Sequence, residues 1–149
     1  MSQNEPRSEY NQQDVQQLMY VFQYLENQQN LLSEQLDMLE SQIRGVSLSK
    51  VTMEGLKGVQ TDHEIMIPIG SNAFTKAKLM DPQKFLVTIS NDMVLEKNIQ
   101  DAIKSMDLLL ESYQNIKNKL SDQLTEISNQ LSKIRPQIEQ IYEANAGRR

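Results

Sequence analysis

Apolar residues recur at alternating steps of three and four along two long stretches of this chain. In the first stretch the a positions of the heptad repeat are Val15, Phe22, Gln29, Leu36 and Ile43, and the d positions are Leu18, Leu25, Leu32, Leu39 and Val46. Nine of these ten residues are apolar, which predicts a coiled-coil helix over residues 14–58, with Gly58 as its stop. The exception is Gln29, and a lone polar residue in such a core often fixes the register of two helices.

The second stretch repeats this pattern and predicts a helix over residues 98–144. Its a positions are Ile103, Leu110, Lys117, Leu124, Leu131 and Ile138, and its d positions are Met106, Tyr113, Leu120, Ile127, Ile134 and Ile141. Pro136 removes one backbone donor, so we expect a kink near the end of this helix. An antiparallel pairing in which residue numbers add up to about 156 brings a positions against d positions. Residues 1–13 and 145–149 are expected to be flexible ends.

The stretch between the helices has an apolar period of two, which is typical of strands. Four strand-like segments cover residues 64–69, 73–79, 84–90 and 93–97. Gly70 and Asn72 suit a tight turn with positive φ, and Pro82 stands at the favoured second position of the next turn. Residues 64–97 are therefore predicted to form two β-hairpins.

These elements predict an α+β fold, in which a long antiparallel α-helical coiled coil carries two central β-hairpins. Two isolated hairpins cannot bury both their faces and their edges, so we expect them to pair with other chains. Pro68 agrees with this expectation, because a residue without an N–H fits an edge strand or a strand exchange between subunits. The hairpins are thus interpreted as an oligomerisation platform.

Charge narrows the set of partners. The net charge is −5, and residues 1–60 carry eight acidic and four basic side chains. No segment forms the basic stripe that phosphate contacts need, so we expect no nucleic-acid partner. The chain has no Cys, its first residues are polar, and no apolar run approaches a membrane span. We expect a soluble, cytoplasmic protein that does not contact a membrane.

No residue pattern supports catalysis. The triplet Asp62-His63-Glu64 has metal-binding side chains, but neighbours at the start of a strand point in different directions and no second cluster completes a site. The segment EGLKG over residues 54–58 lacks the spacing of a phosphate-binding loop. We expect no enzyme activity, no catalytic residue, no metal and no cofactor.

One end of the predicted coiled coil has more apolar residues than its core needs. Residues 18–22 read LMYVF, and a two-stranded coil uses only Leu18 and Phe22 of these. Outward positions are predicted for Met19, Tyr20, Val21 and Tyr24, while Ile138, Ile141 and Tyr142 lie near the other terminus. This surplus either locks a fraying helix end against a neighbouring helix or binds another molecule.

The order of helix, two hairpins and helix, with IMIPIGSNAFTKAKLMDPQKFLVTISNDMVLEKNIQDAI in the centre, resembles the alpha-class subunits of prefoldin. Beta-class subunits of that family have one hairpin, so four strands favour the alpha class. The resemblance implies a hexamer of two alpha and four beta subunits, in which the hairpins join an oligomeric β-barrel. It also implies a holdase that binds unfolded polypeptides between its coiled-coil tips and passes them to a group II chaperonin without ATP.

The resemblance assigns roles to two sets of residues. The expected assembly residues are Ile65, Ile67, Pro68, Ile69, Phe74, Leu86, Val87, Ile89, Val94 and Leu95. The expected client-binding residues are Leu18, Met19, Tyr20, Val21, Phe22, Tyr24, Ile138, Ile141 and Tyr142. The alternative is a coiled-coil scaffold or tether that binds one dedicated folded partner.

Overall fold

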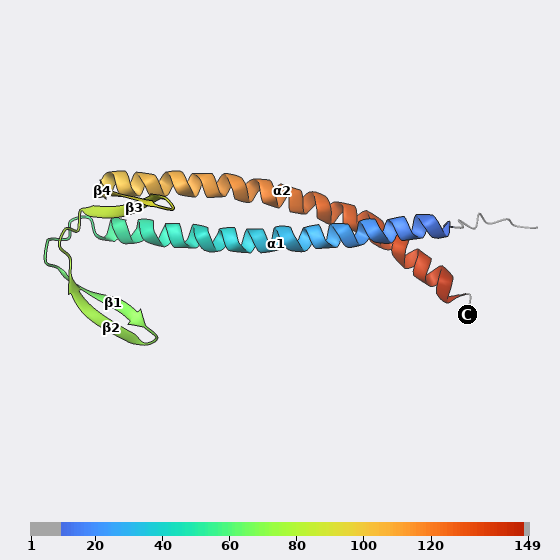
Figure 1. Cartoon of the computed structure of the whole chain (residues 1–149), viewed down its shortest axis with the longest axis horizontal. Coiled ribbons are helices and arrows are strands. Elements are labelled where there is room, and N and C mark those ends of the chain that lie inside the picture. Colours follow the sequence, from blue (N-terminus) through green and yellow to red (C-terminus); the bar gives the residue numbers. More distant parts are fainter. Residues whose placement is uncertain (1–9, 148–149) are drawn as a thin grey trace, which may run out of the picture. The chain divides into compact units, whose positions relative to one another are not determined.

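The computed structural model describes residues 10–147 and contains two long helices and two β-hairpins (Figure 1). The elements are α1 (Gln12–Gly55), β1 (Glu64–Gly70), β2 (Ala73–Lys78), β3 (Lys84–Ser90), β4 (Met93–Asn98) and α2 (Ile99–Ala146). This order confirms the predicted α+β class. The chain divides into two compact units, and each contains part of both helices. One unit consists of residues 1–39 and 116–149, and the other of residues 40–115.

Polar side chains begin both helices. The Asn11 side chain accepts a hydrogen bond from the Gln13 amide at 3.3 Å, and Asn98 accepts one from the Asp101 amide at 2.8 Å. Both are side-chain caps that satisfy a free amide of the first turn. Residues 1–9 of the predicted flexible start and the last two residues lie outside the described part.

The ends of the helices differ by a few residues from the prediction. Helix α1 ends at Gly55 and not at Gly58, because the amides of Leu56 and Lys57 bond to carbonyls three residues back and close a turn. Gly58 has a φ of 77° and completes the reversal of the chain. Helix α2 continues to Ala146, so it includes the first two residues of the predicted tail.

The seam of the coiled coil is made by the predicted heptad positions. Every a and d residue named above is buried or half-buried. In the unit that holds both termini, the buried side chains are Leu25, Leu32, Leu39, Leu131, Ile138 and Ile141. In the predicted pairing, the residue numbers of two partners add up to 156. Leu25 and Leu131 are such a pair, and both are buried. The pattern of burial therefore agrees with the predicted heptad positions.

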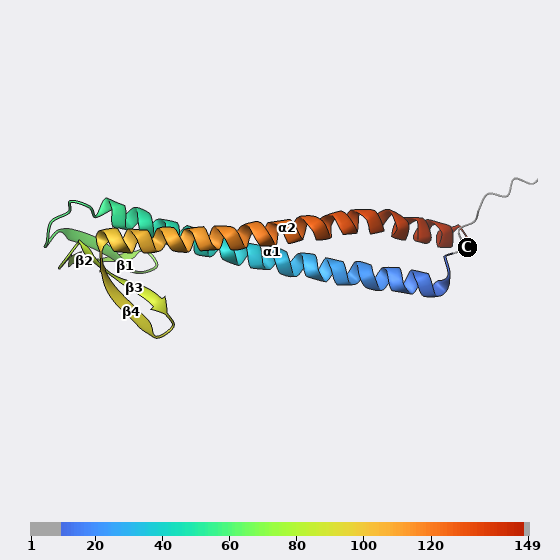
Figure 2. The same cartoon turned by 90° about the horizontal axis from the view of Figure 1, so that it is seen from above.

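The two hairpins have the same pairing register, with equivalent residues twenty positions apart. Figure 2 shows the β3–β4 hairpin in open view. Pro68 pairs with Phe74, and Thr88 pairs with Val94, before each ladder shifts by one residue at the turn. Such a shift is a β-bulge, which bends a strand and increases its twist. Asn72, in the first turn, has a φ of 59°, as predicted.

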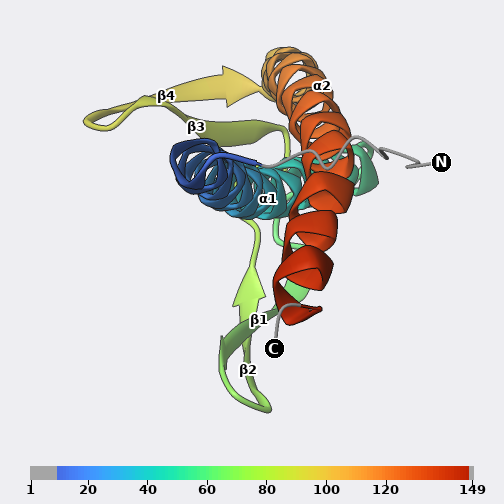
Figure 3. The same ribbon diagram turned by 90° about the vertical axis from the view of Figure 1, so that its right-hand side faces the viewer.

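The β3–β4 hairpin packs on the helices, whereas the β1–β2 hairpin extends away from them (Figure 3). Val87 of β3 forms a buried cluster with Met53 of α1 and Ala102 of α2. The partly buried residues around this cluster are Phe85, Ile103 and Met106. Ala102 is 0% exposed, because a small side chain lets the hairpin approach the helix closely. No residue of β1 or β2 is buried.

Candidate functional site

Gln83 holds the start of the β3–β4 hairpin between the ends of the two helices. Its side-chain amide donates a hydrogen bond to the Leu56 carbonyl at 3.2 Å, and its carbonyl accepts one from the Ile99 amide at 2.8 Å. Pro82 before it is buried, and the Asp81 side chain accepts a hydrogen bond from the Gln83 amide at 3.0 Å. Sequence reasoning found the turn at Pro82 but missed the role of Gln83, for which the sequence carries no local signal.

The predicted assembly residues are mostly exposed in the single chain. Those with large exposed side chains are Ile67, Ile69, Phe74, Leu86, Ile89, Val94 and Leu95. Pro68 is also exposed, Ile65 is half-buried, and only Val87 is buried. Apolar side chains of this size are rarely left in water over neighbouring strands, so the hairpins provide an apolar surface that another chain can cover.

Equivalent positions of the two hairpins differ sharply in burial. Ile67 corresponds to Val87 when the identical pairing registers are superposed. Val87 is 6% exposed against the helices of its own chain, whereas Ile67 is 42% exposed. The β1–β2 hairpin thus has an exposed apolar face, whereas the equivalent face of β3–β4 is packed against the helices of the same chain.

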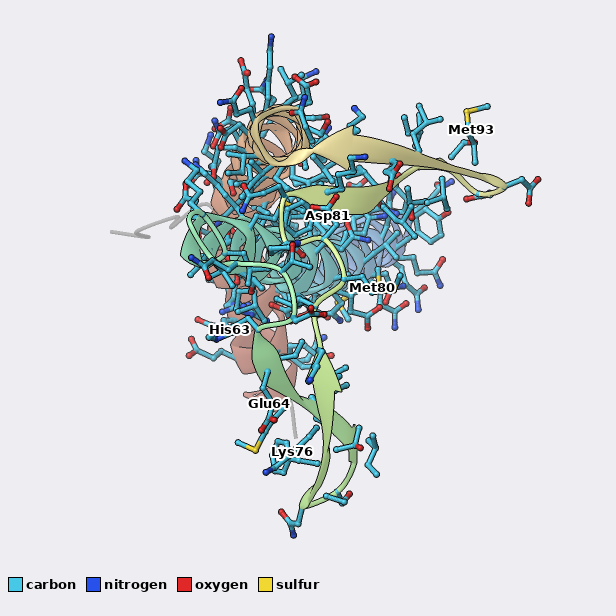
Figure 4. All side chains as sticks on the ribbon, turned by 90° about the vertical axis from the view of Figure 1, so that its left-hand side faces the viewer. His63, Glu64, Lys76, Met80, Asp81 and Met93 are labelled. Carbon is cyan, nitrogen blue, oxygen red and sulfur yellow. The ribbon has the colours of Figure 1, made fainter. Side chains whose placement is uncertain are left out.

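The polar residues of β1–β2 form a surface ion pair and not a metal site. Lys76 Nζ lies 3.4 Å from Glu64 Oε1, next to His63 (Figure 4). Both side chains of this pair are more than half exposed, so the pair contributes little to stability. Over residues 10–147, no three His, Cys, Asp or Glu side chains gather closely enough to hold a metal ion.

A stronger ion pair joins the helices within the unit of residues 40–115. Lys50 Nζ lies 2.6 Å from Asp107 Oδ1 and 3.9 Å from Glu54 Oε1. The hydrogen bond from Lys50 to Asp107, and then the charge of Asp107, raise the pKa of Lys50 above its ordinary value. A further hydrogen bond, from Lys97 Nζ to Ser105 Oγ at 2.7 Å, attaches β4 to α2. The ion pair thus connects the two helices, and the Lys97–Ser105 hydrogen bond holds the hairpin beside α2.

The predicted client-binding residues divide into an exposed and a buried group. Tyr20 and Tyr24 are 71% and 54% exposed, and Val21 and Tyr142 are exposed as well. Half-buried positions are found for Leu18, Met19 and Phe22, and Ile138 and Ile141 are buried. The last two fill the seam, so the accessible apolar surface at this end of α1 consists mainly of the tyrosines and Val21.

Two further exposed apolar residues continue this surface along α1. Leu31 and Met38 are 48% and 62% exposed, and they follow Tyr24 at intervals of seven residues. Sequence reasoning missed them because it searched for runs of apolar residues. The signal that could have found them is the recurrence of apolar residues at the outward c position of the heptad.

No described helix, from Gln12 to Ala146, is long and apolar enough to cross a membrane. This finding concerns the helices of residues 10–147 only.

Residues 25–144 match the family model described as Prefoldin subunit. The chain is 24% identical over 134 residues to prefoldin subunit alpha of Pyrococcus horikoshii, which covers 89% of this chain and 90% of that protein. It is 32% identical over 107 residues to prefoldin subunit alpha of Thermococcus onnurineus, with coverage of 71% and 72%. A cryo-EM structure of filamentous PFD from Methanocaldococcus jannaschii is similar with a TM-score of 0.66 and 17% identity, over 77% of this chain and 95% of that one. That last similarity concerns the fold alone.

Proposed function

This chain belongs to the prefoldin family, and we propose that it is an ATP-independent holdase subunit that binds unfolded polypeptides at the end of its coiled coil. Family membership makes it a chaperone-type subunit and not an enzyme. A protein that does not hydrolyse nucleotide has to use binding energy alone to keep its clients from aggregating.

The observation that carries this proposal is the exposed apolar surface at one end of α1. Tyr20, Val21 and Tyr24 are exposed although the seam needs none of them. Tyrosine offers a large apolar ring and a polar hydroxyl, which suits contacts with many different sequences. Such a surface binds exposed apolar segments of unfolded chains and has little affinity for native proteins, whose apolar residues are inside.

The hairpins serve assembly in this proposal. We expect two copies of this chain to join four beta-class subunits, with β1–β2 and β3–β4 contributing strands to a shared β-barrel. The exposed apolar face of β1–β2 and the exposed outer residues of β3–β4, such as Leu86, support this role. Delivery of clients to a group II chaperonin and the cytoplasmic location stay predictions.

The test is suppression of aggregation by the complex of this chain with its partner subunits. Tyr20→Ser, Val21→Ser and Tyr24→Ser together should weaken suppression of light scattering by a denatured client several-fold, while the hexamer stays intact. A matched control is Leu48→Ser with Val51→Ser, because these residues are also exposed on α1 but lie in the other unit. Undiminished activity of the triple variant would exclude this end of α1 as the client site.

A scaffold that binds one folded partner is the alternative. It predicts saturable binding to that partner and no effect on the aggregation of unrelated denatured proteins. Suppression of aggregation for several unrelated clients, without binding to their native forms, separates the two functions.

A further inference from the structure

One continuous face of α1 combines exposed apolar residues with polar residues in alternation. Residues separated by three or four positions follow each other along one side of a helix. Within residues 10–39 this face consists of Tyr20, Tyr24, Asn27, Leu31, Glu34 and Met38, and all six are exposed. We call it the outer face of α1. From Tyr20 to Met38 this face is about 27 Å long at 1.5 Å per residue, so it extends well beyond Tyr20 and Tyr24.

The charged residues of α1 within residues 10–39 are all acidic; Glu34 lies on the outer face, and Asp37 lies beside it, one residue before Met38. Residues 10–39 include Asp14, Glu26, Glu34 and Asp37 and contain no Lys or Arg. None of these four carboxylates makes an ion pair within the described residues 10–147. The α2 segment of the same unit, residues 116–147, is balanced, with four basic and four acidic side chains. Negative potential is therefore concentrated on one of the two helices.

We propose that the outer face of α1 selects unfolded segments in which apolar residues alternate with Lys or Arg. The apolar side chains of such a segment would cover Tyr24, Leu31 and Met38, and its basic groups would lie near Glu34 and Asp37. This inference rests on the proposed holdase function and names the class of client that it prefers. A second copy of the same face is a poor partner, because carboxylates of equal sign would meet.

The apolar and the charged contacts have different roles in this recognition. Burial of the apolar side chains supplies most of the affinity, at about 25 cal/mol per Å² of surface removed from water. Glu34 on this face and Asp37 beside it distinguish between clients, because like charges repel and opposite charges attract over about 8 Å at physiological ionic strength. A segment rich in Asp or Glu with the same apolar residues should therefore bind more weakly.

The test uses the assembled complex and three fluorescent peptides that share the same Leu positions. Their intervening positions carry Lys, Gln or Glu, and fluorescence anisotropy measures each Kd. We expect the Lys peptide to bind tightest and the Glu peptide weakest, with about a 3- to 10-fold difference at low salt. This difference should largely disappear at about 0.5 M salt, where charges are screened over a few ångströms.

A pair of charge reversals locates the effect on the helix. Glu34→Lys should remove or reverse the preference for the Lys peptide. Glu126→Lys introduces the same change on an exposed residue of α2 in the same unit, and it should leave the preference unchanged. Equal binding of all three peptides, or equal effects of the two variants, would overturn this inference and leave the holdase function intact. If no peptide and no denatured client binds, the proposed function fails and the inference fails with it.

Discussion

The side-chain amide of Gln29 donates a hydrogen bond to the Ser128 hydroxyl across the two helices, with 3.0 Å between Nε2 and Oγ. This contact connects the one polar residue predicted in the first heptad seam to a partner on α2. The residue numbers of this pair add up to 157, and so do those of Lys50 and Asp107 in the other unit. Two independent polar contacts therefore report the same antiparallel register.

Replacing Gln29 by Leu should make the coiled coil more stable but less specific. Gln29 is half-buried in the seam, and a polar residue in a coiled-coil core costs stability, so the apolar variant should gain on the order of 1 kcal/mol in the free energy of unfolding. The same change removes the only side-chain hydrogen bond of Ser128 to the opposite helix that the described residues show. Chemical denaturation of the assembled complex measures the gain.

The loss of specificity can be measured separately by cross-linking, because the chain has no Cys of its own. Leu32→Cys with Leu124→Cys fits the observed register, and Leu32→Cys with Leu131→Cys corresponds to a shift by one heptad. In the presence of Gln29 only the first pair should form a disulfide. If Gln29→Leu gives no shifted product, this residue does not fix the register.

Replacing Ala102 by Leu should detach the β3–β4 hairpin from the helices. Ala102 is fully buried against Val87 and Met53, so three additional carbons have no space to occupy. Overpacking of this kind costs about 1–3 kcal/mol. The measurement is the yield of complex with partner subunits in size-exclusion chromatography. Ala144→Leu, at an exposed site of α2, is the matched control and should assemble normally.

The Lys50–Asp107 ion pair should give the complex a dependence of stability on alkaline pH. Because its partner raises the pKa of Lys50, this pair stabilises the folded state below the ordinary lysine pKa, and the contribution is lost as pH rises through the raised value. Asp107→Asn should therefore lower Tm slightly at pH 7–9. The difference from the unmodified chain should shrink above a pH of about 10.4. A constant difference across this range would show that the charge of Lys50 is not involved.

The chain expressed without partner subunits should self-associate through its hairpins. Exposed strand edges and apolar side chains such as Ile69, Phe74 and Leu86 favour pairing with any available strand. Light scattering should detect oligomers or aggregates at micromolar concentration. Phe74→Lys and Leu86→Lys should reduce this association, since each places a charge on an exposed sheet position. A dispersed, stable monomer of the unmodified chain would contradict the assembly role of the hairpins.

The regular part of this fold could be predicted from the sequence because it depends on short-range periodicity. Heptads defined both helices and the seam, and the turn signals at Asn72 and Pro82 separated the strands. Matching a with d positions suggested an antiparallel pairing with sums near 156, but one sequence does not fix the register, which the Gln29–Ser128 and Lys50–Asp107 contacts place at sums of 157. Each of these features depends on residues close to one another along the chain, or on the pairing of two repeats.

The rest of the fold depends on contacts between residues that are far apart in the sequence, and such contacts produce no periodic pattern in it. Gln83 bonds to Leu56, 27 positions away, through an amide that any loop residue could carry. Ala102 looks like an ordinary helix residue, yet its small size decides how closely β3 packs. The different burial of Ile67 and Val87 also follows from which hairpin the helices cover, and both residues look alike in sequence.

In the proposed assembly, the repeated hairpin would set the number of neighbouring chains with which this subunit can pair. A chain with one hairpin can offer strands at a single site, and it ends or caps a growing sheet. A chain with two hairpins of the same register can bridge two neighbours, as a divalent monomer does in a polymer. The ratio of chains with two hairpins to chains with one hairpin would then decide whether the strands close into a finite ring or whether further chains continue to add. In that proposed assembly, the supply of this subunit relative to its partners would control assembly size.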